Sequence, residues 1–422
     1  MKKLLFLLVI MLLIQSFGTR TTYAEAPDIQ AEAAILMNTS NTLTLYEKSS
    51  RQQIQPGSLT KIMTAIIAIE KMEDINAPIT AAPDIIAGYD FSFGNMGILA
   101  NETLTVKDLL YGMMIYDAGE AAELLAHNLA GGYDAFLACM NQKAAVLGAE
   151  NTHFTNASGY YDPQQVSTAY DLFLISRYAM ESQTFRDIVS TKLYEIPAND
   201  HYRQIRYLAN TNQMLSTNRT TQYYMPSVKG IKTSYMKEFG HSLSISAQKG
   251  NTGFLCIIIN SPADAEGNHA YMDATSLLTY GFENFETVRL SEKNEILDEV
   301  SIPNGQGTSH VLLVAGENLD AFLPKDYHPE ELELTANKPD SVSAPIEAGQ
   351  ALGTMTVAYQ SQQLGQIDLC AYEAVGVDYA KDILNKVKWV ATSPFFLIPL
   401  FLLIAYLIIR TIVINYHKFL QS

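Results

Sequence analysis

The residues of this sequence best suited to chemistry are Ser58 and Lys61, in the segment Ser58-Leu-Thr-Lys61. This segment follows Pro56-Gly57, and the apolar stripe within residues 59–72 indicates that a loop enters a helix here. Residues three apart share a helix face, so the hydroxyl and the amine can meet. A serine hydroxyl is a weak nucleophile that needs an adjacent base, and a neutral lysine can supply one. The free N–H groups of a helix N-terminus also favour developing negative charge.

Other segments of the chain strengthen the interpretation of Ser58 and Lys61 as a nucleophile and its base. Pro56-Gly57-Ser58-Leu-Thr-Lys61-Ile-Met-Thr-Ala65 resembles the active-site segment of the serine D-alanyl-D-alanine carboxypeptidases, the low-molecular-mass penicillin-binding proteins of peptidase family S11. Gly230-Ile-Lys232-Thr233-Ser234-Tyr235 resembles their strand motif, which normally reads Lys-Thr-Gly. Four more segments match in order: Leu109-Leu-Tyr-Gly112, Asn156-Ala-Ser-Gly159, Ser167-Thr-Ala-Tyr-Asp171-Leu and Ile346-Glu-Ala-Gly-Gln350-Ala-Leu-Gly353. The resemblance covers roughly residues 30 to 375.

The resemblance implies a hydrolase that trims peptidoglycan. In that family's reaction Ser58 attacks the carbonyl of the penultimate D-Ala of a stem peptide, and Lys61 accepts the hydroxyl proton. An acyl-enzyme forms, the terminal D-Ala leaves, and water releases the product. β-Lactams mimic the D-Ala-D-Ala end and are expected to acylate Ser58. The resemblance implies no cofactor and no metal.

The resemblance also implies which residues bind the substrate: Lys232, Thr233, Ser234 and Tyr235. Lys232 and Thr233 are expected to hold the terminal carboxylate, because charge-assisted hydrogen bonds are the stronger kind. The backbone N–H groups of Ser58 and Tyr235 are expected to form the oxyanion hole.

Two positions depart from the family's pattern. The third motif, Ser-x-Asn, is replaced by Asp117-Ala118-Gly119 at unchanged spacing from Leu109-Leu-Tyr-Gly112. Gly119 has no side chain with which to bind the substrate backbone, and Asp117 is an anion where a neutral hydroxyl is normal. Ser234 replaces the Gly of Lys-Thr-Gly, where glycine permits close approach of strand and substrate.

The anion at position 117 leaves the catalytic competence open. Asp117 beside Lys61 favours the charged form of the amine, so we expect activation of Ser58 to suffer. Asp117 acting as a second base is the opposite alternative. One hypothesis is therefore an active D-alanyl-D-alanine carboxypeptidase of reduced activity. The other is a catalytically impaired pseudoenzyme of the same fold that binds cell wall or partner proteins.

Both ends of the chain carry apolar segments. Residues 1–24 have a basic start and an unbroken apolar run, which predicts a secretory signal peptide; a retained membrane anchor is the alternative. Residues 389–409 hold no charge and are long enough to cross a bilayer. Residues 410–422 carry Arg410 and Lys418 but no acid, which predicts a cytoplasmic tail. We therefore expect a single-pass protein of the cell membrane whose catalytic domain lies outside the cytoplasm.

The pattern of apolar residues between the two ends changes once, after residue 284. Helical stripes and apolar strands over residues 30–284 predict an α/β domain with a central antiparallel sheet flanked by helices, of the penicillin-binding or β-lactamase type that the resemblance implies. One helix is expected to start at Thr105, which has capping-box spacing to Asp108. Residues 285–375 hold short strand-like runs between polar turns, which predict a small all-β domain. Residues 376–388 are predicted to link it to the membrane span.

The overall composition limits the classes of partner and of chemistry that this chain is expected to use. The 422 residues carry a formal net charge of -16, and so acidic a surface disfavours nucleic acid. Three cysteines, Cys139, Cys256 and Cys370, lie in apolar runs without a CxxC pair, which predicts buried free thiols. The sequence contains neither an HExxH pattern nor a P-loop, so metal and nucleotide chemistry find little support.

Overall fold

The computed structural model describes residues 26–40, 42–217, 220–359 and 362–420. The chain divides into two compact units. The first runs to Glu286 and includes Pro324–Asp326, and the second comprises Thr287–Leu323 and the chain from Tyr327 onward. The expected signal peptide, residues 1–24, lies outside the described residues.

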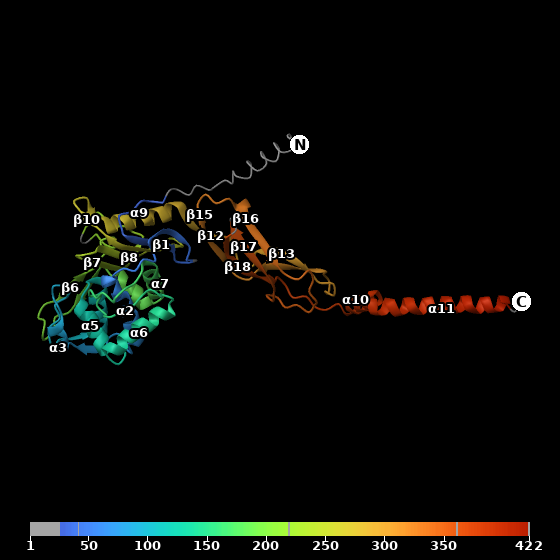
Figure 1. Cartoon of the computed structure of the whole chain (residues 1–422), viewed down its shortest axis with the longest axis horizontal. Helices are drawn as coiled ribbons and strands as arrows, with labels where there is room; N and C mark the ends of the chain where they lie inside the picture. Colours follow the sequence, from blue (N-terminus) through green and yellow to red (C-terminus); the bar gives the residue numbers. More distant parts are fainter. Residues whose placement is uncertain (1–25, 41, 218–219, 360–361, 421–422) are drawn as a thin grey trace, which may run out of the picture. The chain divides into compact units, whose positions relative to one another are not determined.

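The first unit is built on a five-stranded antiparallel sheet in the order β2-β1-β9-β8-β7 (Figure 1). Its strands are β1 (Ala33–Asn38), β2 (Thr44–Lys48), β7 (Val228–Met236), β8 (Gly240–Lys249) and β9 (Thr252–Ser261). β1 lies inside the sheet because it pairs with both β2 and β9. β7 lies at one edge, where backbone groups face away from the ladder and are available to other partners.

Helices cover both faces of this sheet. All of β1 is buried, because its side chains alternate between two layers. Ile35 and Met37 join the main core cluster with residues of α2, α4 and α5, whereas Leu36 lies close to Gly281 of α9. Figure 1 shows α9 on the opposite side of the sheet from α2, α5, α6 and α7. The helix-flanked antiparallel sheet predicted from the sequence is therefore confirmed.

The helices of the first unit are α2 (Thr60–Lys71), α3 (Pro83–Gly88), α4 (Val106–Ile115), α5 (Gly119–Asn128), α6 (Tyr133–Val146), α7 (Ala169–Ala179), α8 (Gln183–Ser190) and α9 (His269–Asn284). Its short strand pairs are β3 (Pro78–Thr80) with β4 (Thr103–Thr105), β5 (Leu193–Ile196) with β6 (Arg206–Ala209), and β10 (Ala263–Asp264) with β11 (Gly267–Asn268).

Two helix starts matter for the site. α4 begins with the predicted capping box, since Thr105 accepts from the Asp108 N–H and the Asp108 carboxylate accepts from the Thr105 N–H. α2 is preceded by a short 3-10 turn, η1 (Gly57–Leu59), and neither element has a side-chain cap at its own N-cap residue. The start of α2 therefore depends on acceptors from elsewhere in the fold.

The second unit is a β domain followed by two helices. A five-stranded sheet has the order β13-β14-β18-β17-β16, and β12 pairs with β15. Its elements are β12 (Phe285–Ser291), β13 (Ile296–Ser301), β14 (His310–Ala315), β15 (Leu319–Pro324), the 3-10 turn η2 (Pro329–Glu331), β16 (Leu332–Asn337), β17 (Ala351–Tyr359) and β18 (Gln362–Ala371). A core cluster that includes Leu313 and Leu369 holds this domain together. The all-β character predicted for this part of the chain is confirmed.

Much of the segment predicted as a linker, residues 376–388, is helical. α10 (Tyr379–Thr392) is capped by the Asp378 side chain, which accepts from the N–H groups of Ala380 and Lys381. The Asn385 side chain donates to the Pro303 carbonyl at 3.1 Å. α10 is thus tied to the β domain rather than extended from it.

The apolar span begins later than predicted. α11 (Pro394–Leu420) contains Pro394–Asn415, the one helical stretch of the described chain that is long and apolar enough to cross a membrane. Ser393 is extended, with φ −70° and ψ 142°, because a following proline disfavours helical backbone. Trp389 therefore belongs to α10, and the predicted range 389–409 includes the end of α10 and the first part of α11.

The three cysteines are free thiols, as predicted. Cys256 is buried in the sheet, whereas Cys139 and Cys370 are only partly buried, so the prediction of burial is right for one of the three.

Candidate active site

Ser58 and Lys61 meet as their spacing predicts. Ser58 lies in the 3-10 turn η1 and Lys61 in the first turn of α2. The Lys61 Nζ is 3.1 Å from the Ser58 Oγ, and Lys61 is only 3% exposed. A hydroxyl and an amine at this distance have the geometry of a nucleophile and its base.

Asp117 joins this pair from the loop between α4 and α5. Its Oδ2 accepts from the Ser58 hydroxyl at 3.1 Å, and its Oδ1 lies 3.0 Å from the Lys61 Nζ. The same Oδ1 lies 2.8 Å from the Lys232 Nζ. Asp117 has a φ of 71°, in the left-handed region that aspartate tolerates better than most residues. The expected contact between the Asp117 carboxylate and Lys61 is confirmed, and a second lysine shares it.

The charges at this site shift two pKa values. Burial alone would raise the pKa of the Asp117 carboxyl, but the Lys232 and Lys61 ammonium groups outweigh it and hold that pKa below its ordinary value. Burial lowers the pKa of Lys232, with Asp117 opposing the shift and Lys61 adding to it. The carboxylate form of Asp117 is thus the resting form at neutral pH, set between two amines.

The four residues predicted to bind the substrate lie on β7, the edge strand. Tyr235 is exposed and lines the cleft above Ser58, whereas Lys232 and Ser234 are buried beneath it. The Thr233 hydroxyl is half-buried and lies 2.7 Å from the Thr211 hydroxyl. Lys232 and Ser234 therefore contact the Asp117 and Ser58 groups from beneath the cleft, whereas Tyr235 lies at the rim of the cleft.

Ser234 makes a contact that was not predicted from the sequence. The Ser58 N–H donates to the Ser234 Oγ at 2.9 Å, so the serine in the place of the family's glycine reaches the backbone of the nucleophile. The signal was present in the sequence as Ser234 itself, but a side-chain contact between β7 and η1 is set by the packing of two distant segments.

Sequence reasoning also missed what fills the space beside Gly119. A Cβ at this position would lie 2.3 Å from the Tyr89 hydroxyl oxygen and 3.0 Å from two of its ring carbons. The Tyr89 hydroxyl donates to the Gly94 carbonyl at 2.6 Å, and the Gly119 N–H donates to the same carbonyl at 2.8 Å. Tyr89 thus occupies the volume that an asparagine side chain would need.

Ser58, Lys61 and Asp117 lie in a cleft of about 790 Å³, large enough for a short peptide. Its walls are rich in aromatic side chains, namely Tyr89, Phe93, Tyr160, Tyr161, Tyr235 and Phe239. Phe93 and Tyr160 are in edge contact, with ring centroids 4.6 Å apart. The arrangement is a polar floor with a reactive hydroxyl between largely apolar walls.

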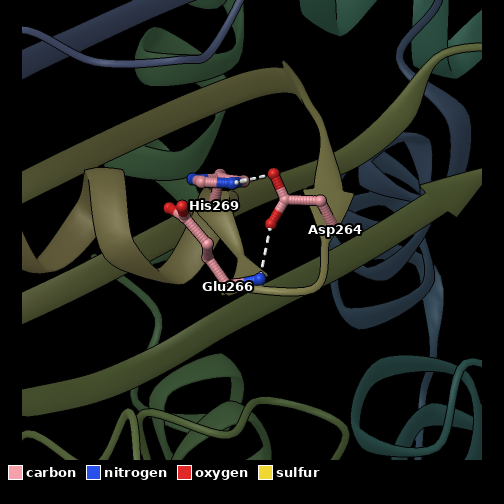
Figure 2. A group of neighbouring side chains, drawn as sticks. All are labelled: Asp264, Glu266 and His269. Carbon is pink, nitrogen blue, oxygen red and sulfur yellow. Dashed lines mark hydrogen bonds and ion pairs between the residues drawn. The ribbon is translucent and has the colours of Figure 1, made fainter.

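A second cluster of ligand-type side chains lies at the start of α9. Among the residues that the structure describes, Asp264, Glu266 and His269 have ligand atoms within 4.8 Å of one another (Figure 2). His269 Nε2 is 2.9 Å from Asp264 Oδ2, and that contact raises the pKa of His269. Asp264 Oδ1 also accepts from the Glu266 N–H, so the turn and the ion pair account for the cluster. None of the three residues lines the cleft, and we assign them no metal.

Comparison with protein families gives two matches. The D-alanyl-D-alanine carboxypeptidase family model matches residues 20–263. The model of the penicillin-binding protein 5 C-terminal domain matches residues 285–377.

Individual relatives agree with these matches. The D-alanyl-D-alanine carboxypeptidase DacF of Bacillus subtilis is 27% identical over 347 residues, which cover 82% of this chain and 85% of the relative. The D-alanyl-D-alanine carboxypeptidase DacB2 of Mycobacterium tuberculosis is 30% identical over 259 residues, or 61% of this chain and 84% of the relative. Penicillin-binding protein 5 of Haemophilus influenzae shares the fold, with a TM-score of 0.65, 23% identity and coverage of 84% of this chain and 99% of its own.

Proposed function

The chain belongs to the D-alanyl-D-alanine carboxypeptidase family, and on this premise we propose that it removes the terminal D-Ala from peptidoglycan stem peptides ending in D-Ala-D-Ala. The observation that carries the proposal is the 3.1 Å contact between the Ser58 Oγ and the Lys61 Nζ at the floor of the cleft. Family membership supplies the class of substrate, and this contact supplies a nucleophile with a base beside it.

The reaction follows from these two groups. Neutral Lys61 takes the proton of the Ser58 hydroxyl as its Oγ bonds to the carbonyl carbon of the penultimate D-Ala. The tetrahedral intermediate collapses, the bond to the terminal D-Ala nitrogen breaks, and the proton passes to that nitrogen. Water then adds to the Ser58 ester, with Lys61 accepting its proton; the bond between the acyl carbon and Ser58 Oγ breaks, Lys61 returns the proton to the Oγ, and the shortened peptide leaves. β-Lactams present the same carbonyl and should acylate Ser58 as stable adducts.

The edge strand supplies the binding groups in this proposal. The N–H groups of Ser58 and Tyr235 stabilise the oxyanion, and the Thr233 hydroxyl donates a hydrogen bond to the terminal carboxylate of the substrate. Lys232 adds positive charge from below, since its ammonium is buried and paired with Asp117. Tyr235 contributes to the rim of the cleft, and Ser234 lies buried beneath it.

A second candidate function, a pseudoenzyme that binds cell wall or partner proteins, is favoured by one specific observation. Asp117 Oδ1 contacts both Lys61 and Lys232 within 3.0 Å, so it pairs with the base and also with the positive charge that would otherwise attract the substrate carboxylate. Both effects slow acylation, and if strong enough they leave a binding protein with the same cleft.

We further propose that residues 1–24 direct export and that α11 anchors the chain in the cell membrane. The support is the span Pro394–Asn415, followed within the chain by Lys418 and no acid, which favours a cytoplasmic C-terminus. In this orientation the cleft lies outside the cytoplasm, on the side where peptidoglycan is found.

The experiment uses the full-length chain in detergent. A D-Ala-D-Ala pentapeptide is the substrate, release of D-Ala is measured, and a fluorescent penicillin reports acylation; Ser58→Ala is the control. Release and labelling that both vanish in Ser58→Ala support the carboxypeptidase. Labelling without release shows a nucleophile that has lost turnover. If D-Ala is not released and the protein is not labelled after long incubation, the proposal is wrong and the pseudoenzyme is favoured.

A further inference from the structure

We infer that Ser234 is a positioning residue that limits the acylation rate of this chain, because its hydroxyl holds the Ser58 N–H that the reaction needs. The inference rests on the proposed function and concerns the same site. It adds an inhibitory contact that is separate from the charge of Asp117.

The contact is short and enclosed. The Ser58 N–H donates to the Ser234 Oγ at 2.9 Å, and Ser234 is 6% exposed. The hydroxyl fills the space above Gly57, where a Cβ would lie 2.5 Å from the Ser234 Oγ. Gly57 has a φ of 51°, so glycine meets both the steric and the backbone demand at this close approach.

The N–H of Ser58 has a single hydrogen, so its partners compete. When the Ser58 Oγ attacks a carbonyl, the oxygen that becomes negative must be held by this N–H, and the bond to Ser234 must first be released. Losing one such donor costs on the order of 10²–10³ in kcat. Ser234 does not line the cleft, so its own hydroxyl proton is not presented to the substrate as a replacement.

The same contact has a structural effect that can be measured separately. Neither η1 nor α2 is capped by the side chain of its own N-cap residue, and the Ser234 hydroxyl satisfies one of the free N–H groups at this helix entry. Removing the hydroxyl should therefore lower stability while it raises the rate. A serine with a structural role alone would show only the loss of stability.

The test compares Ser234→Ala with wild type, using the full-length chain in detergent and a fluorescent penicillin at saturating and subsaturating concentrations. The acylation rate constant is expected to rise at least tenfold, toward the order of 10²–10³ for one oxyanion donor, with little change in the concentration at half-saturation. This split between rate and binding is a readout that a loss of packing would not produce.

Ser242→Ala is the matched control. Ser242 lies directly opposite Ser234 on β8, is 5% exposed, and its Oγ accepts from the Asn260 N–H at 3.0 Å. It therefore loses a buried hydroxyl and a bond to a backbone N–H in the same sheet, but touches no reacting group. Its melting temperature should fall as that of Ser234→Ala does, without any gain in acylation rate.

The outcomes separate this inference from the proposed function. If wild type is labelled and Ser234→Ala is labelled no faster, the inference is overturned and the proposed function stands. If neither protein is labelled, both are overturned. If only Ser234→Ala is labelled, the inference is supported and the wild-type chain is held inactive by this contact.

Discussion

The Asp117 carboxylate and the Lys232 ammonium form an ion pair, 2.8 Å apart, at the floor of the cleft. Lys232 occupies the position from which, by family resemblance, positive charge would reach the carboxylate of the substrate. Its charge is already met inside the protein. In the proposed function, the substrate therefore competes with Asp117 for this lysine, and the competition arises from the acid at position 117.

Replacement of Asp117 by Asn should speed acylation. The change keeps the shape of the side chain, removes the negative charge that pairs with Lys61, and frees Lys232 from its ion pair. We expect penicillin labelling and D-Ala release to rise on the order of tenfold or more, with a lower KM for the pentapeptide. The exposed Glu150→Gln changes the net charge equally and serves as the control. A slower rate in Asp117→Asn would instead favour Asp117 as a base, and an unchanged rate would show that its charge does not limit acylation.

The same substitution should change how stability depends on pH. The pKa of the Asp117 carboxyl is lower in the folded chain than its unfolded value of about 3.9, so the folded state binds fewer protons between those two values. Its stabilising contribution is therefore complete above about pH 4 and lost as the pH falls through the lowered pKa. The melting-temperature gap between wild type and Asp117→Asn should be constant near neutral pH and narrow below pH ~4. A gap that widens in acid would contradict this sign.

Replacement of Gly119 by Asn should destabilise the fold. A side chain at position 119 overlaps Tyr89, and overpacking of this kind costs about 1–3 kcal/mol. In the double variant Tyr89→Ala with Gly119→Asn, the costs should be less than additive, with a coupling of about 0.5–3 kcal/mol. Chemical denaturation of the four proteins measures this cycle.

Gly88→Asn is the control for that cycle, because nothing lies within 4 Å of a Cβ at Gly88. It should change stability by less than about 0.5 kcal/mol. If the changes in the free energy of unfolding for Tyr89→Ala and Gly119→Asn are additive, Tyr89 moves aside without strain. Asp117→Ser with Gly119→Asn restores the family's Ser-x-Asn motif. Because an asparagine at position 119 would overlap Tyr89, we expect this pair of changes to restore the motif's packing only when Tyr89 is replaced as well.

Truncation should locate the membrane anchor. A chain that ends at Ser393 lacks the span Pro394–Asn415 and is expected to leave the membrane fraction on expression. A chain that ends at Asn415 keeps the span and should stay with the membrane. Membrane extraction by carbonate, followed by immunoblotting, distinguishes the two. Retention of the shorter chain would show that α10 or the N-terminal segment is sufficient for anchoring.

Much of the fold followed from local patterns. The capping box of Thr105 and Asp108 and the apolar run within α11 depend on neighbours in the chain, and both were predicted. The predicted span 389–409 includes Pro394 within one continuous segment. In the structure Pro394 begins a new helix, because the preceding Ser393 is kept extended.

The order of motifs along the sequence determined the family, and the three-residue spacing determined that Ser58 and Lys61 would meet, because helix geometry acts over a single turn. Only the tertiary structure decided what surrounds them. Asp117, Ser234 and Tyr89 come from a loop, an edge strand and a second loop, and no local spacing specifies which of their atoms contact the site. Side-chain packing between distant segments places an anion between two lysines and a hydroxyl on the Ser58 N–H.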